Sequence, residues 1–167
     1  MNFIEAELCK RLVDILKGIF TEAGLEIEVD GNWLVDEFGG FKDVDSTGAG
    51  SKLYVTVSPR YYPEYTAKTA EMDVKLEADI RHDDSFDGRK VNAAYAKLID
   101  LLDLWHDDFE EMKKALAIQS TPTPTTYNYS FDPCGLRLSG GQWDRTSDPK
   151  GWSLDQSFTI KGRIKRS

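Results

Sequence analysis

Two short stretches of this sequence contain residues that could bind a metal ion or carry out acid–base catalysis. Residues 81–88 read RHDDSFDG, and residues 105–112 read WHDDFEEM. They hold the two histidines of the chain, His82 and His106, and each histidine is followed by two aspartates. Imidazole and carboxylate groups are common ligands of divalent metals, and a His–Asp pair can also transfer protons. The spacing of these groups decides whether they can act together.

That spacing argues against a shared site. Two metal ligands on one helix need to be three or four residues apart, as in H-x-x-x-H, and neither stretch has a second histidine in reach. The stretches flank a predicted helix over residues 91–105, which separates them by about 20 Å at 1.5 Å per residue. We therefore interpret both as turn and capping sequences, and predict no catalytic residue, no metal site and no cofactor.

The composition is typical of one globular domain. The chain has 167 residues, of which 40% are hydrophobic and 30% charged, and its formal net charge is -8. An acidic chain is a poor candidate for binding nucleic acid, which needs clustered Lys and Arg. The sequence shows no signal-peptide pattern and no apolar run long enough to span a membrane. Cys9 lies in an apolar helical pattern, which predicts a buried free thiol.

Hydrophobic periodicity predicts the main elements. A stripe of apolar residues at spacings of three and four predicts a helix over residues 3–22, and a second stripe predicts the helix over residues 91–105. Strict alternation over residues 72–81 predicts a strand with Met72, Val74, Leu76 and Ile80 facing the core. A helical stripe and an alternating strand must bury against each other. We expect an α+β fold: a mixed or mostly antiparallel sheet with two main helices packed on one face.

The remaining segments read as shorter strands and loops. We expect strands over residues 25–29 and 53–57, the first ending in a turn at Asp30-Gly31 and the second stopped by Pro59. We expect a Pro/Thr-rich connector at about residues 119–133 within a single domain spanning residues 1–167. A turn at Gly140-Gly141 and a final strand over residues 153–165 complete the chain.

The best candidates for function are interface residues rather than catalytic ones. Tyr and Trp favour protein–protein interfaces, and charged groups of opposite sign on two strands could form a contact between subunits. The candidate subunit-interface residues are Asp73, Glu77, Asp79, Lys161, Arg163, Lys165, Tyr61, Tyr62, Trp143 and Trp152. We expect the acidic and basic sets to lie at opposite edges of the subunit, where they would favour a head-to-tail contact.

The order of elements also suggests a family. A long amphipathic helix opens the chain, and the alternating strand MDVKLEADIR leads through a polar loop into the helix VNAAYAKLIDLLDLW. A glycine-containing hairpin and the strand SFTIKGRIKRS close it. This pattern resembles the tail-terminator, or tail-completion, proteins of long-tailed bacteriophages and related prophages. The likeness covers most of the chain except the Pro/Thr-rich connector.

The resemblance implies a small α+β subunit that is not an enzyme and carries no cofactor. Such proteins form rings, commonly hexameric, that cap the tail tube and join it to the head. Their partners are further copies of the chain, the tail-tube protein and head–tail connector proteins. The resemblance places the protein in the bacterial cytoplasm during assembly and in the tail of the virion if a phage encodes it. The alternatives are a monomeric ligand- or protein-binding module using the aromatic loops that we expect at residues 60–65 and 143–152 and, least favoured, a metal-dependent hydrolase.

Overall fold

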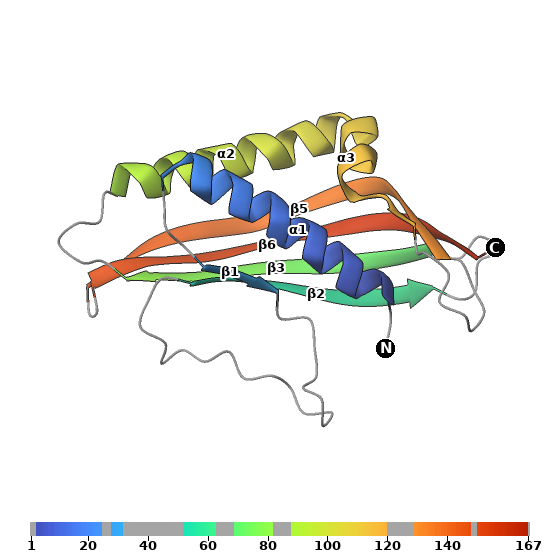
Figure 1. The fold of residues 1–167 in the computed structure, drawn as a ribbon, viewed down its shortest axis with the longest axis horizontal. Coiled ribbons are helices and arrows are strands. Elements are labelled where there is room, and N and C mark those ends of the chain that lie inside the picture. The colour runs from blue at the N-terminus through green and yellow to red at the C-terminus, as the bar shows by residue number, and fades with distance from the viewer. Residues whose placement is uncertain are drawn as a thin grey trace, which may run out of the picture.

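The fold is a helical layer on one face of a six-stranded sheet (Figure 1). The computed structural model describes residues 3–24, 28–31, 52–62, 69–81, 88–119, 129–147 and 150–166. The elements are α1 (Phe3–Glu22), β1 (Glu28–Gly31), β2 (Lys52–Tyr62), β3 (Thr69–Arg81), α2 (Gly88–Asp107), α3 (Phe109–Leu116), β4 (Ile118–Gln119), β5 (Tyr129–Ser147) and β6 (Lys150–Arg166). The expected α+β class, with two main helices on one face of a mostly antiparallel sheet, is confirmed.

The sheet has the strand order β1-β2-β3-β6-β5-β4. Four of its five neighbouring pairs are antiparallel, and the pair of β1 with β2 is parallel. The two central strands are β3 and β6, which pair over the whole length of β3 from Thr69↔Arg163 to Arg81↔Gly151. The C-terminal strand is therefore inserted beside the strand predicted most clearly from alternation, and not placed at an edge of the sheet.

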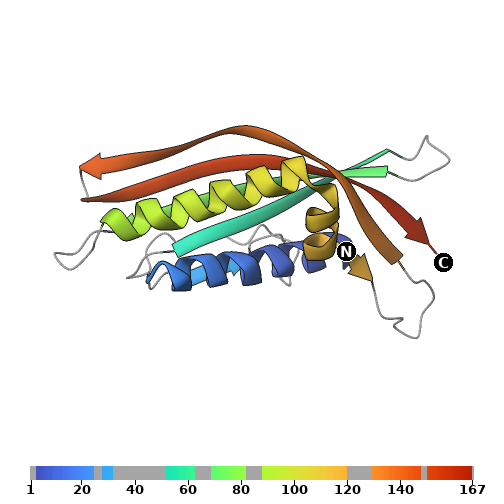
Figure 2. The same cartoon turned by 90° about the horizontal axis from the view of Figure 1, so that it is seen from above.

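The two long helices lie side by side on the sheet and run in opposite directions (Figure 2). The helix α1 covers the side of β1 and β2, and α2 contacts β5 and, through Tyr95, Gln156 of β6. Gly24 follows the end of α1 with φ +76, a left-handed conformation that glycine adopts at little cost, and its N–H donates to the carbonyl of Thr21 at 3.0 Å. Asp108 separates α2 from the short helix α3.

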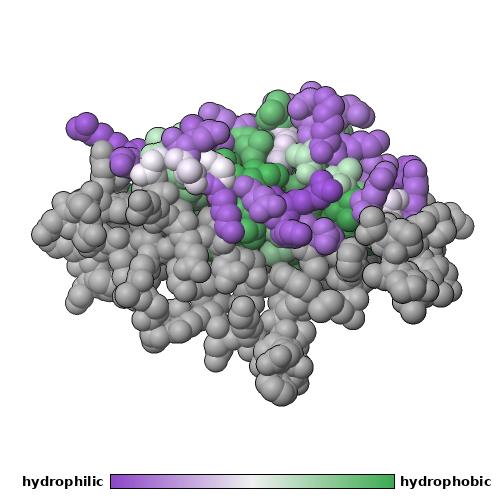
Figure 3. All heavy atoms as spheres, viewed as in Figure 1, coloured by the Kyte–Doolittle hydropathy of each residue, from purple (hydrophilic) through white to green (hydrophobic). Residues whose placement is uncertain are grey.

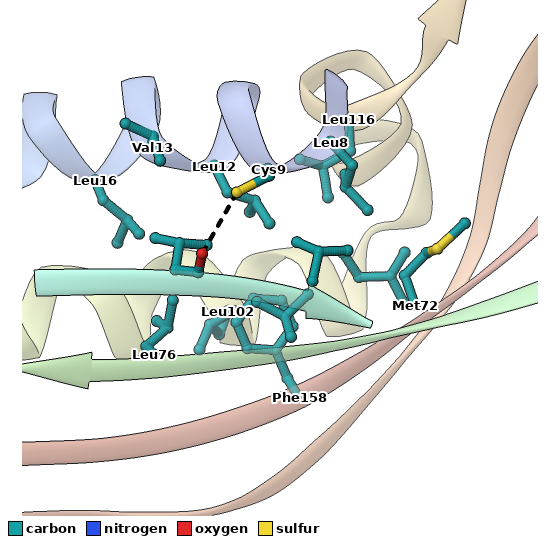
Figure 4. Close-up of a cluster of buried hydrophobic side chains, with 14 of the residues drawn as sticks. Leu8, Cys9, Leu12, Val13, Leu16, Met72, Leu76, Leu102, Leu116 and Phe158 are labelled. Atoms are coloured by element: carbon teal, nitrogen blue, oxygen red, sulfur yellow. Dashed lines mark hydrogen bonds between the residues drawn. The ribbon is translucent and has the colours of Figure 1, made fainter. Parts of the chain in front are cut away.

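One hydrophobic core lies between the helices and the sheet (Figure 4). The stripe of α1 contributes Leu8, Leu12 and Leu16, and the alternating residues of β3 contribute Met72, Val74 and Leu76; all six are at most 2% exposed. Residues Leu98, Leu102 and Trp105 of α2 are equally buried. Cys9 is a buried free thiol, as predicted, and its Sγ donates a hydrogen bond of 3.4 Å to the carbonyl of Val55.

Two expected strand ends are wrong. Pro59 does not stop β2, which continues to Tyr62 and pairs with β3 through Pro59↔Met72. The strand β1 pairs only with Lys52–Val55, so no described strand borders β2 at Pro59 on that side, and proline is tolerated at such an edge position. Asp30 and Gly31 belong to β1 and pair in parallel with Tyr54 and Val55, so they do not form the expected turn.

The expected turn at Gly140-Gly141 is also wrong. The strand β5 runs through both glycines, and the register shift between Leu138 and Gly141 is a β-bulge. One extra residue in β5 is thereby accommodated without ending the strand. The start of β5, residues 129–133, lies within the segment expected to be a connector, while residues 120–128 lie outside the described part of the chain.

Candidate interaction surface

The face of the sheet opposite the helices is polar. Alternate residues of each strand point to opposite faces, and the described ones that do not enter the core are exposed or half-buried, except the buried Thr159. No helix or strand of the described ranges covers this face, which we call the open face (Figure 1). Its members with described side chains include Ser58, Arg60, Glu71, Asp73, Lys75, Glu77, Arg137, Gln142, Asp144, Asp155, Ser157, Thr159, Lys161, Arg163 and Lys165.

The acidic and basic candidate residues share this face. They come from β3 and β6, which are hydrogen-bonded neighbours, so the expectation that the two sets lie at opposite edges of the subunit is wrong. Because the strands are antiparallel, however, Glu77 lies opposite Asp155 while Lys161 lies opposite Glu71, six residues further along β6. The charges are therefore separated along the strands and not across the sheet.

Asp73 is held by groups of its own chain. Its Oδ1 accepts hydrogen bonds from Arg60 Nη2 at 2.9 Å and from Thr159 Oγ1 at 2.8 Å. The same guanidinium lies 3.6 Å from a carboxylate oxygen of Glu71. Thr159 is only 7% exposed although it lies on the open face, because it sits in this network. Asp73 therefore contributes to the order of the open face, and a subunit contact through it would compete with these bonds.

One end of the open face is basic. Lys161, Arg163 and Lys165 are exposed along the last third of β6, and their neighbours in the sheet include Glu71, Asp132 and Ser130. Asp132 also forms an ion pair of 3.3 Å with Lys113 of α3. In the described part of the chain, Glu71 and Asp132 thus have other cations beside them. This favours contact of Lys161, Arg163 and Lys165 with another molecule. We call Lys161, Arg163 and Lys165 the basic end.

The other end of the open face is acidic. Glu77 and Asp155 lie directly opposite each other, an arrangement of like charges that is unfavourable in a sheet. The positive charge of Lys75 offsets this repulsion. A hydrogen bond with Glu77 raises the pKa of Lys75. Desolvation lowers that pKa, and the charges of Glu77 and Asp155 raise it further. Asp144 is exposed on the adjacent strand and accepts a hydrogen bond from Gln142. We call Glu77, Asp144 and Asp155 the acidic end.

The aromatic candidates lie in strands, and not in loops as expected. Tyr61 and Tyr62 are the last residues of β2 and pair with Ala70 and Thr69. Trp143 and Trp152 belong to β5 and β6. The backbone of these four residues, and that of Asp79 in β3, is described, whereas the orientation of their side chains lies outside the description. Their role at an interface stays a prediction.

The second histidine stretch forms a helix cap. Asp108 Oδ1 accepts hydrogen bonds from the backbone N–H groups of Glu110 at 3.0 Å and Glu111 at 3.3 Å, which begins α3 as expected. His106 is exposed, and its Nδ1 lies 3.2 Å from Asp107 Oδ1. Residues 82–87, with the first stretch, lie outside the described residues. Within the described ranges, no group of three or more His, Cys, Asp or Glu side chains could hold a metal ion.

The long edge of β5 is protected. The short strand β4 pairs only with Ser130 and Phe131, so most of β5 has no neighbour on that side among the described strands. Two register shifts and Pro133 interrupt the edge, and such features prevent another strand from pairing with it. A surface for assembly is therefore better sought on the open face than along this edge.

The solvent side of the helices is mostly hydrophilic, with apolar residues between the helices (Figure 3). Leu104 of α2 and Phe109 of α3 are 47% and 48% exposed. They lie at the junction of α2 and α3. Single exposed apolar side chains are a common feature of protein surfaces. None of the described helices is long and apolar enough to cross a membrane.

Sequence reasoning missed one buried polar residue. Gln156 is 3% exposed and lies on the helix side of β6, where alternation alone suggests an apolar residue. Its Nε2 donates to the carbonyls of Ser139 at 3.0 Å and Ser157 at 3.2 Å, and its Oε1 lies 3.5 Å from the hydroxyl of Tyr95. The signal in the sequence is Gly141, whose missing Cβ leaves room for the amide.

Comparison with known proteins adds no relative. The chain matches no model of a protein family and no curated protein. Function is therefore inferred from the resemblance of the element order, from the fold and from the open face.

Proposed function

We propose that this protein is a structural subunit of a phage or prophage tail, of the tail-terminator or tail-completion kind. It would form a ring that caps the tail tube and joins the tube to the head. Its partners would be other copies of the chain, the tail-tube protein and the head–tail connector proteins. It would act in the bacterial cytoplasm during assembly and remain in the tail of the virion.

The observation that carries the proposal is the open face with its two oppositely charged ends. The α+β layout implied by the resemblance agrees with the fold, and no described helix or strand covers the face of the sheet opposite the helices. A subunit whose acidic end meets the basic end of the next makes a head-to-tail contact, which closes into a ring when the rotation between subunits permits.

The charge arrangement revises the expected contact. The acidic partner is better assigned to Glu77, Asp144 and Asp155 than to Asp73, because Asp73 is bonded to Arg60 and Thr159. The basic partner remains Lys161, Arg163 and Lys165. Contacts between such exposed charges are individually weak, about 0–1 kcal/mol each, so ring formation would depend on several of them and on a tail tube as template.

The test is assembly in the presence of the tail-tube protein. Replacing Lys161, Arg163 and Lys165 by Glu should prevent rings and tail capping seen by electron microscopy, because the basic end would repel the acidic end of its neighbour. A matched control replaces the exposed Lys10, Lys17 and Lys114 of the helices by Glu, which changes the net charge equally but should leave rings intact. Circular dichroism checks that both variants fold.

The results separate the contact from the function. Normal rings from the basic-end variant would remove the electrostatic part of the proposal. Failure of the unmodified protein to bind any tail tube, together with tight binding of an unrelated small ligand, would refute the tail role. That result would favour the alternative of a monomeric binding module.

A further inference from the structure

The open face is complementary in charge to a copy of itself turned end for end. The basic end and the acidic end belong to the same face, and about ten residues of β6, or roughly 33 Å of extended chain, separate Asp155 from Lys165. A second chain placed face to face with its strands reversed brings its acidic end over the basic end of the first. The same contact then occurs twice, as a twofold axis requires.

The choice of Lys161 and Asp155 as the contacting pair sets where that axis would lie. The axis lies in the plane between the two sheets, perpendicular to the strands and level with the pair Val74↔Phe158. Along each strand, a residue on one side of that level then faces the residue of the second copy that is equally far on the other side. Lys161 then faces Asp155 of the second copy, and Lys75 faces Asp73 of the second copy. Small hydroxyl side chains meet near the axis, because Ser157 faces Thr159 of the second copy.

Two pairings in this arrangement are between like charges. Glu71 faces Glu77 of the second copy, and Asp132, at the level of Arg163, faces Asp144 of the second copy, at the level of Ser153. Arg60 lies 3.6 Å from Glu71, Lys75 is hydrogen-bonded to Glu77, and Lys113 lies 3.3 Å from Asp132. These cations reduce the repulsion locally, and the attraction rests on the Lys161–Asp155 pair, which forms twice.

We propose that the open face is the interface of a twofold dimer, in which two copies pack sheet to sheet with their strands antiparallel. Four strands about 4.8 Å apart and about 30 Å long would bury roughly 1,000 Å² in total, which is at the low end for a specific interface. The dimer is therefore weak and sensitive to salt. It does not rest on the proposed tail role, since it concerns the isolated protein; on the tail tube the same residues would exchange this twofold contact for the head-to-tail one.

Sedimentation velocity of the isolated protein over a range of concentrations is the first experiment. The unmodified chain should shift from the mass of one 18.9 kDa chain to twice that mass as concentration rises, and the dimer should weaken as salt rises from 50 mM to 500 mM. A mass of one chain at every concentration and salt, up to millimolar protein, would overturn the proposal. Assembly on the tail tube could still occur after that result.

Charge reversals then test the geometry. Lys161→Glu and Asp155→Lys should each raise the dissociation constant of the dimer by about tenfold or more, since each places like charges face to face twice. An equimolar mixture of the two variants should recover a dimer, because the introduced glutamate of one chain meets the introduced lysine of the other and the unmodified pair completes the contact. Lys17→Glu on α1 is the matched control and should leave the dissociation constant unchanged.

The size of the mixed complex separates the twofold contact from a head-to-tail one. A twofold interface stops at two chains, whereas a head-to-tail contact between the same residues continues into larger closed or open assemblies. A mixture that recovers complexes of two chains supports the twofold dimer. Recovery of larger assemblies, or no recovery, would overturn it.

Discussion

The side-chain amide of Gln156 lies directly over Gly141, so that a Cβ at residue 141 would overlap it. The two residues are neighbours in the β5–β6 ladder, just beyond the bulge in β5. A buried amide needs hydrogen-bond partners, and here the bulge presents the Ser139 carbonyl to Gln156 Nε2. The glycine, the bulge and the glutamine thus form one unit that lets β5 continue across the sheet.

Gly141→Ala should therefore destabilise the protein by about 1–3 kcal/mol, because the added methyl displaces a buried, hydrogen-bonded amide. Gly140→Ala is the matched control, since a Cβ there meets nothing within 4 Å. It should change the free energy of unfolding by less than about 1 kcal/mol. Urea unfolding followed by circular dichroism measures both. Equal effects of the two substitutions would contradict this role of Gln156.

Gly162 has a similar constraint from an aromatic ring. Phe131 is 1% exposed and covers Gly162, where a Cβ would overlap the ring and lie 2.9 Å from the carbonyl oxygen of Asp132. Gly162→Ala should cost about 2–4 kcal/mol, because a backbone atom cannot move aside as a flexible side chain can. Gly135→Ala, with its nearest contact at an ordinary 3.8 Å from Lys161 Cβ, should cost much less in the same assay.

The core of β3 gives a third prediction. Leu76 is 1% exposed, so its predicted facing is confirmed. Leu76→Ala should lower the free energy of unfolding by about 2–5 kcal/mol through lost burial and the cavity left behind. Ser58→Ala, on the open face of the neighbouring strand, should change it by less than about 0.5 kcal/mol. A loss below 1 kcal/mol for Leu76→Ala would mean that the helices do not pack tightly over β3.

Substitutions at the neighbouring residues Asp107 and Asp108 test the cap of α3. Asp108→Ala removes an oxygen that accepts hydrogen bonds from two backbone N–H groups, and should cost about 0.5–2 kcal/mol in thermal or urea unfolding. Asp107→Ala removes the same charge from a side chain that is 83% exposed, and should be close to neutral. If both substitutions cost the same, the charge at the helix junction would matter and the cap would not.

The sequence predicted those elements whose pattern is local. The stripes of α1 and α2 and the alternation over Met72–Leu76 are each contained in one segment, so periodicity alone predicts which residues enter the core. The continuation of β2 through Pro59 and of β5 through Gly140-Gly141 could not be predicted in this way. Both depend on pairing with a distant strand, which overrides the local preference of proline and glycine for turns.

The candidate surface shows the same limit. Alternation correctly placed Glu77 and Lys161 on the wet side of their strands, but it could not show that β3 and β6 are neighbours. That neighbour relation joins residues 70 to 94 positions apart and depends on the strand order of the whole sheet. The bond of Asp73 to Thr159 could not be predicted for the same reason.

Lys75 gives the last prediction, which concerns pH. Its pKa is raised in the folded protein, first by the hydrogen bond with Glu77 and then by the charges of Glu77 and Asp155. A raised lysine pKa means that the stabilisation is present below the unfolded value of about 10.4 and is lost as pH rises through the folded pKa.

Because the pair is exposed, Lys75→Met should cost no more than about 1 kcal/mol at pH 7. The difference from the unmodified protein should stay constant from pH 7 to 9.5 and shrink above pH 10.5. Urea unfolding at several pH values measures this difference, and a difference that persists at pH 11.5 would show that Lys75 acts through its aliphatic stem and not through its charge.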